Sequence, residues 1–195
     1  PEVACLSFGT TATVNVCSTN YQEAIRHLPA YPAIIPKKFC YEVMLYRGFW
    51  MVSWFRDQFG FPELEKASQS EQSAESFFDA LVDAVPPGAL GLTLQPYWGA
   101  GVREPGPEAK GAIIGFGDAH KREHLYRAIL EGLSFGLREG LERITKRCGV
   151  NPVRLSISGG GSQSDAAMQL TADIFGLPAE RPSTYETSGL GAAIN

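Results

Sequence analysis

Residues 153–175, VRLSISGGGSQSDAAMQLTADIF, join a predicted strand to a predicted helix through consecutive glycines. Residues 153–158 alternate apolar and polar side chains, as a half-buried strand does, and the glycines at 159–161 end the run. We expect the helix to open at residues 162–165, where Ser and Asp have capping-box spacing, and to close at Gly176. Such a turn can approach a phosphate closely, but it is equally consistent with packing alone.

A second turn with similar chemistry lies near the start of the chain. Residues 4–18, ACLSFGTTATVNVCS, contain two β-rich runs around Gly9, Thr10 and Thr11, and so predict a hairpin. The Thr10 hydroxyl and the neighbouring backbone N–H groups could hold a terminal phosphate. Alone, this turn is more simply explained as a plain β-turn. Two phosphate-capable turns beside strands favour a binding site more than either does separately.

The remaining pattern alternates helices and strands. We expect a buried helix over residues 49–59, a mobile loop over 63–73, a helix over 74–85, a buried strand over 112–116 and short strands near 41–45 and 91–98. The longest helix spans about 120–148, with Asp118 as its candidate N-cap. Gly132, Gly136 and Gly140 run along this helix, which predicts close backbone packing. The order predicts an α/β fold with a mixed sheet.

Composition excludes several classes of protein. The 195 residues carry a net charge of -4, and no Lys/Arg cluster suggests a nucleic-acid partner. No apolar run reaches the roughly 18 residues of a membrane span, and we expect no membrane association. The four cysteines are far apart and never form CxxC, which favours reduced cytoplasmic thiols over zinc or disulfides. The chain lacks a signal peptide and both its ends look cut, so we expect a fragment of a longer protein.

Other candidate residues have simpler explanations. His120, with Asp118 and His124, could serve metal or acid–base chemistry, but a solvated helix N-terminus is the favoured reading. Arg103 lies in a Gly- and Pro-rich loop and is expected to be solvated. An aromatic group could wall a base pocket, although we expect most of it in the core: Tyr46, Phe49, Trp50, Trp54 and Phe55. No catalytic triad, Walker loop or metal-ligand cluster is present in the sequence.

Several motifs, taken in order, resemble one family over nearly the whole chain. They are FGTTA at 8–12, Arg47-Gly48 followed by WFRD at 54–57, LQPY at 94–97, GAIIGF at 111–116 followed by His124-Leu125 and AILE at 128–131, SGGGSQS at 158–164, and GLGAA at 189–193. This series resembles the C-terminal domain of the FGGY carbohydrate kinases. Phe116, Gln95 and Ser164 depart from the family pattern; related kinases often have Asn at the last of these positions.

The resemblance implies an actin-like, ribonuclease-H-like ATPase fold, with residues 1–195 as one ATP-binding domain. In the family, the sugar sits mainly on an N-terminal domain and MgATP mainly on this one. Carried over by position, the ATP-contacting residues would be Gly9, Thr10, Gly48, Gly160, Gly161 and Ser164. The first two would meet the β- and γ-phosphates, and Gly48 would border their path. The last three would line the α-phosphate and adenosine.

The resemblance also implies what the chain lacks. The family's catalytic base is an Asp upstream of the hairpin, so this chain would contain no catalytic residue and no metal ligand. We expect the fragment to be inactive and to bind ATP weakly or not at all. Apolar surface at its ends could let it form dimers. Its sugar or polyol substrate would be bound through the missing domain.

Two alternative hypotheses for the function of the chain remain. One is a non-catalytic actin-like regulatory or assembly domain. The other is an acetate-kinase-like or hexokinase-like member of the same superfamily, which the 111–131 segment disfavours.

Overall fold

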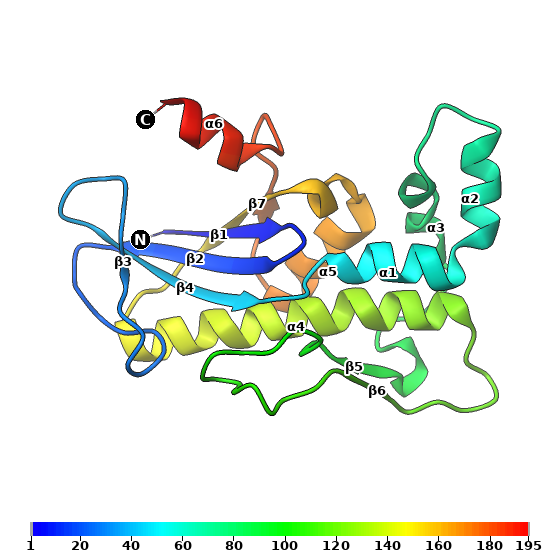
Figure 1. Ribbon diagram of the computed structural model, residues 1–195, viewed down its shortest axis with the longest axis horizontal. Helices are drawn as coiled ribbons and strands as arrows, with labels where there is room; N and C mark the ends of the chain where they lie inside the picture. The colour runs from blue at the N-terminus through cyan, green and yellow to red at the C-terminus, as the bar shows by residue number, and fades with distance from the viewer. Residues whose placement is uncertain (1, 195) are drawn as a thin grey trace.

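The computed structural model describes residues 2–194 and shows a mixed sheet flanked by helices (Figure 1). The sheet has the order β3-β4-β2-β1-β7-β8. Its strands are β1 (Val3–Phe8), β2 (Ala12–Ser18), β3 (Tyr31–Pro32), β4 (Phe39–Leu45), β7 (Arg154–Ser158) and β8 (Ala179–Glu180). The predicted hairpin is confirmed, because β1 and β2 pair antiparallel. The pairs β1–β7 and β7–β8 are parallel.

One long helix, α4 (Arg122–Cys148), packs against the sheet and carries much of the core. Apolar residues alternate along the strands, so every second side chain, such as Leu6, Val14 and Ile157, is buried. The other helices are α1 (Trp50–Phe59), α2 (Phe61–Ser68), α3 (Asp79–Asp83), α5 (Asp165–Phe175) and α6 (Thr187–Ile194), with 3-10 turns η1 (Ala74–Phe77), η2 (Ala89–Gly91) and η3 (Gly160–Gln163). Helix α5 packs against α4, and Figure 1 shows α4 running the length of the molecule.

The predicted close packing along α4 is confirmed. A Cβ atom on Gly132 would lie 2.6 Å from the Leu94 carbonyl oxygen, and one on Gly140 would lie 2.9 Å from Val43 Cγ1. These contacts come from β5 (Thr93–Gln95) and β4, so the glycines let two separate strands approach the helix backbone.

Three local predictions are wrong. Residues 63–73 do not form a loop throughout, because α2 occupies 61–68. Pro62 lies in the first turn of this helix, where proline is well tolerated. Both carboxylate oxygens of Glu63 accept hydrogen bonds from Arg122 at 2.8 Å. The predicted buried strand is β6 (Ala112–Ile114), which pairs with β5 in a small two-stranded sheet and leaves Ile114 65% exposed. The helix predicted over 74–85 is divided into η1 and α3.

Both predicted helix caps are also wrong. Helix α4 begins after Lys121, whose backbone N–H donates to His124 Nδ1 at 3.1 Å, so Asp118 lies outside the cap. Helix α5 is capped by Ser164, whose Oγ accepts from the Ala167 N–H at 3.0 Å. The Ser162 hydroxyl instead donates to the Gly159 carbonyl, which tightens the glycine turn.

All four cysteines are free among residues 2–194. No helix in the described part of the chain is long and apolar enough to cross a membrane.

Candidate functional site

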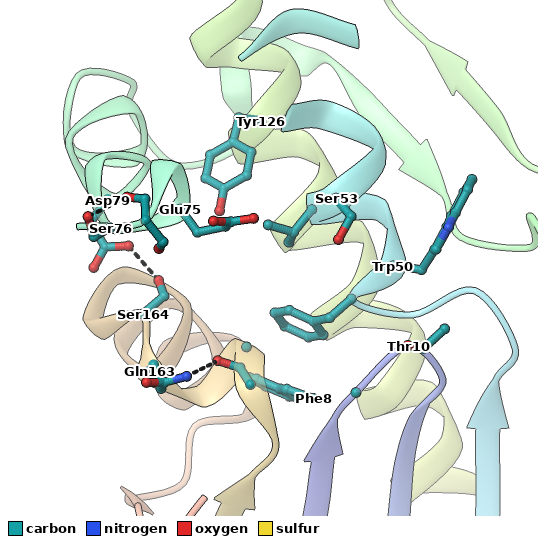
Figure 2. Close-up of a pocket in the computed structure, with 16 residues that line it drawn as sticks. Phe8, Thr10, Trp50, Ser53, Glu75, Ser76, Asp79, Tyr126, Gln163 and Ser164 are labelled. Atoms are coloured by element: carbon teal, nitrogen blue, oxygen red, sulfur yellow. Dashed lines mark hydrogen bonds between the residues drawn. The ribbon is translucent and has the colours of Figure 1, made fainter. Parts of the chain in front are cut away.

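A cleft of about 730 Å³ opens where several elements converge (Figure 2). It lies between the β1–β2 turn, the start of α1, the η1–α3 segment and the glycine turn before α5. The residues that line it are Phe8, Gly9, Thr10, Phe49, Trp50, Val52, Ser53, Ser73, Glu75, Ser76, Asp79, Tyr126, Gly160, Gly161, Gln163 and Ser164.

The sheet topology explains why the two glycine turns meet. Strands β1 and β7 are parallel neighbours, with Ser7 opposite Ser158 in the register. Their carboxyl ends therefore lie at the same edge of the sheet, and the turns that follow them lie side by side. This edge is where ligands commonly bind in sheets that contain parallel strands.

Five of the six predicted ATP-contacting residues line the cleft, and Gly48 does not. A Cβ atom on Gly48 would lie 2.3 Å from both the Cβ and the backbone N of Ala12. Gly48 therefore lets the chain before α1 pack tightly on β2. The next residue ties α1 to the hairpin tip, because the Phe49 N–H donates to the Gly9 carbonyl at 3.0 Å.

The three glycines at 159–161 are required for different reasons. Gly159 has φ of +88°, and a Cβ there would lie 2.9 Å from the Phe8 backbone. A Cβ on Gly161 would meet the Phe49 ring at 2.3 Å, and that ring stacks on Phe8 with centroids 4.1 Å apart. A Cβ on Gly160 would meet nothing within 4 Å. Two of these glycines are therefore needed for packing, while Gly160 keeps the cleft wall open.

The N-terminus of α5 already binds a side chain from another helix, α3. Ser164 Oγ donates to Asp79 Oδ1 at 2.5 Å, and the Ala166 N–H donates to Asp79 Oδ2 at 3.2 Å (Figure 2). The carboxylate of Asp79 complements the positive end of the helix dipole and joins α3 to α5. The Ser164 hydroxyl is engaged within the protein on both its donor and its acceptor side.

An acidic wall, defined here as Glu75 and Asp79 together with Tyr126, which lies beside Glu75, faces the glycine turns (Figure 2). Glu75 Oε1 accepts from Arg56 Nη1 at 2.7 Å, and this Arg belongs to the WFRD motif of α1. Burial, together with the negative charges of Asp79 and Glu75, raises the pKa of the Tyr126 hydroxyl, which stays protonated at neutral pH. The sequence carried no signal for this wall, because its residues come from two separate segments, 74–85 and about 120–148, that were expected only to be helices.

The cleft contains polar groups but no cationic side chain among its lining residues. Backbone N–H groups at its two glycine turns, and the side-chain hydroxyls and amide of its lining residues, are therefore the donors that it can offer to an anion. The Arg47 guanidinium lies 5.0 Å from the centre of the Trp50 ring but does not itself line the cleft.

The other candidate residues lie elsewhere. His120 Nδ1 accepts from the Gly117 N–H at 2.8 Å near the start of α4, and no group of His, Cys, Asp or Glu among residues 2–194 is arranged to hold a metal ion. Arg103 is exposed. Of the aromatic group, Phe49 and Trp50 line the cleft, whereas Phe55 lies in the core.

Known proteins place this architecture in a family. Residues 4–195 match the model of the FGGY family of carbohydrate kinases, C-terminal domain. The chain is 32% identical over 196 residues to the uncharacterized sugar kinase YgcE of Escherichia coli (strain K12), covering all of this chain and 39% of that protein. It is 37% identical over 159 residues to glycerol kinase of Pseudothermotoga lettingae, covering 80% of this chain and 30% of that protein.

Solved structures of kinases have a similar fold. The fold matches xylulose kinase from Rhodospirillum rubrum with a TM-score of 0.78 and 27% identity, covering 100% of this chain and 37% of that one. It also matches Plasmodium falciparum glycerol kinase with ADP, with a TM-score of 0.75 and 23% identity, over 98% of this chain and 37% of that one. The fold is thus the actin-like ATPase fold of these kinases, and the chain spans well under half the length of each relative. The chain belongs to the FGGY family of carbohydrate kinases and corresponds to the family's C-terminal domain.

Proposed function

We propose that this chain is the nucleotide-binding half of an ATP-dependent sugar or polyol kinase, and that MgATP binds in the cleft. The observation that carries the proposal is the meeting of two glycine turns, at Gly9-Thr10 and at Gly160-Gly161, on one wall of a cleft of about 730 Å³. Both turns follow parallel neighbouring strands. The volume suits a nucleotide-sized ligand, since small-molecule sites commonly enclose about 300–1,000 Å³.

The charge distribution favours one orientation of the nucleotide. The acidic wall would repel phosphates, whereas the glycine turns present backbone N–H groups and no negative side chain. We therefore place the phosphates at the turns, with Gly9 and Thr10 at the terminal ones, and the base toward Glu75 and Tyr126.

Magnesium would be carried by the nucleotide. No cluster of ligands among residues 2–194 is arranged to hold a metal ion, and Mg²⁺ in kinases is bound largely by the substrate phosphates and water. When bound, the ion neutralises charge that develops on the phosphoryl group. This chain's residues line the cleft and orient the nucleotide in it.

We propose that the sugar, which accepts the phosphoryl group, and the catalytic base both lie in the sugar-binding domain of the kinase. Asp79 is the one Asp among the residues that line the cleft, and both its oxygens already accept hydrogen bonds from α5. It is therefore unsuited to take a proton from a sugar hydroxyl. We propose that an Asp of the sugar-binding domain does so, in the cytoplasm where ATP is available.

The test compares the full-length protein with the isolated 195-residue chain. ADP formation is measured with MgATP and a panel that includes glycerol, gluconate and xylulose. We expect turnover by the full-length protein with a member of the panel, and none by the isolated chain. Turnover by the isolated chain would place the base within it. Failure of every acceptor in a broad panel would instead favour a non-catalytic actin-like module.

A further inference from the structure

Two free thiols lie opposite each other on the large sheet, outside the nucleotide cleft. Strands β2 and β4 are antiparallel neighbours (Figure 1), and their register pairs Cys17 with Cys40. The adjacent residues Val16 and Tyr41 are each only 1% exposed and belong to the core. Because side chains alternate along a strand, Cys17 and Cys40 both point to the other face of the sheet. Neither of them lines the cleft.

The strand pairing brings these two cysteines within reach of a disulfide. Directly opposite residues on antiparallel strands have Cα atoms about 4.5–5.5 Å apart, and a disulfide joins residues whose Cα atoms are about 4.4–6.8 Å apart. Cys5 lies on the same face, but the β1–β2 register places it opposite Asn15. Cys5 is therefore diagonal to Cys17, and diagonal neighbours are about 7–8 Å apart. Among residues 2–194, Cys17 and Cys40 are the cysteines that strand pairing sets face to face.

The two thiols differ in exposure, which gives them different roles towards an oxidant. Cys17 is exposed, whereas Cys40 is half-buried and its Sγ donates to Asn15 Oδ1 at 3.5 Å. Burial, followed by the charge and hydrogen bonding of Cys17, raises the pKa of Cys40 to about 12. Cys40 is therefore a thiol at neutral pH. Since oxidation follows thiolate character and exposure, an oxidant in solution reacts with Cys17 first.

We propose that Cys17 and Cys40 are a redox-sensitive pair, which a peroxide converts into a reversible disulfide between β2 and β4. The Cys17 thiolate attacks one peroxide oxygen, the O–O bond breaks, and Cys17 becomes a sulfenic acid. The Cys40 sulfur then loses its proton and attacks the Cys17 sulfur, and the hydroxyl group leaves as water. Two thiols and one hydrogen peroxide thus give one disulfide and two waters, because the sulfurs lose the two electrons that the peroxide gains.

The disulfide would tie together the two ends of segment 18–39. This segment carries β3 and exposes the large side chains of Tyr31, Ile34 and Ile35. In a reducing compartment the pair stays as thiols, and a dithiol reverses the link by exchange. The pair is independent of the nucleotide cleft, so this proposal does not rest on the function proposed above.

The test treats the reduced full-length protein with hydrogen peroxide, blocks the remaining thiols with N-ethylmaleimide and maps tryptic peptides without reduction. Trypsin cleaves after Arg26 and Lys38, so Cys17 and Cys40 fall in different peptides. We expect the peptide that ends at Arg26 to be joined to residues 39–47, and we expect dithiothreitol to separate them. In Cys40→Ser, dimedone should instead trap Cys17 as a sulfenic acid.

Cys5→Ser is the matched control, since Cys5 lies on the same face and in the same tryptic peptide as Cys17. The link should persist in Cys5→Ser and be absent from Cys17→Ser. A link that survives Cys17→Ser, or a wild-type map in which peroxide leaves both thiols open to N-ethylmaleimide or oxidises Cys17 without joining it to Cys40, would overturn the proposal. The wild-type map requires no substitution, so it decides the question even where a variant fails to fold.

Discussion

Gly160→Asp is expected to raise the KM for ATP at least about fivefold in the full-length enzyme, with little change in the KM for the sugar. A side chain at this position meets nothing within 4 Å, so the carboxylate would extend into the cleft beside the phosphates without disturbing the fold. Two like charges about 4 Å apart repel by about 1 kcal/mol in water and about 4 kcal/mol near a protein surface, and the smaller figure already weakens binding several-fold.

The control for this substitution is Gly160→Ala. It adds a methyl group to the same open space and carries no charge, so we expect ATP kinetics close to those of the wild type. Steady-state kinetics with each substrate varied in turn provide the measurement. If the aspartate variant keeps the wild-type KM for ATP, Gly160 does not border the nucleotide.

Arg127→Ala is expected to lower the free energy of unfolding by about 3–5 kcal/mol, the usual effect of removing one partner of a buried ion pair. The Arg127 and Glu131 side chains are only 13% and 10% exposed, and they bind at 2.7 Å within α4. Arg127 Nη1 also donates to the Val82 and Val85 carbonyls. Glu131 accepts from the Gly88 N–H. The substitution therefore leaves a buried carboxylate without its cation and releases the end of α3.

Helix α4 provides a matched control. Arg138 and Glu142 form an ion pair with the same spacing, but their side chains are 45% and 63% exposed. Exposed pairs of this kind contribute less than about 1 kcal/mol, so Arg138→Ala should be much milder. Urea unfolding of the three proteins provides the comparison. Equal losses in the two variants would show that burial of the Arg127–Glu131 pair does not determine its contribution.

The sequence predicted those parts of the site that depend on local patterns. The β1–β2 hairpin and the glycine turn after β7 both carry short-range signals, and Gly9, Thr10, Gly160, Gly161 and Ser164 all reach the cleft. Gly48 shows the limit of this reasoning. A glycine in a motif can serve a ligand or a neighbouring strand, and only the contact with Ala12 identified its packing role.

The acidic wall could not be predicted because it depends on contacts between distant segments. Asp79 accepts a hydrogen bond from Ser164, the N-cap of α5, which lies 85 residues later in the chain. Polar residues over 63–73 suggested a loop, but the bidentate bond from Arg122 to Glu63 fixes α2 against α4. The two cap predictions failed because other side chains make the cap contacts: Ser164 rather than Ser162 caps α5, and the His124 ring rather than Asp118 binds the backbone at the start of α4.

The central claim, that the cleft holds the nucleotide, is tested most directly by photolabelling the full-length protein with 8-azido-ATP and mapping the labelled peptides. The account predicts label on peptides that line the cleft, within 73–79, around Tyr126 or within 160–164, and predicts that excess unmodified ATP removes it. Label that ATP competes away but that maps only to peptides outside the cleft would contradict the account.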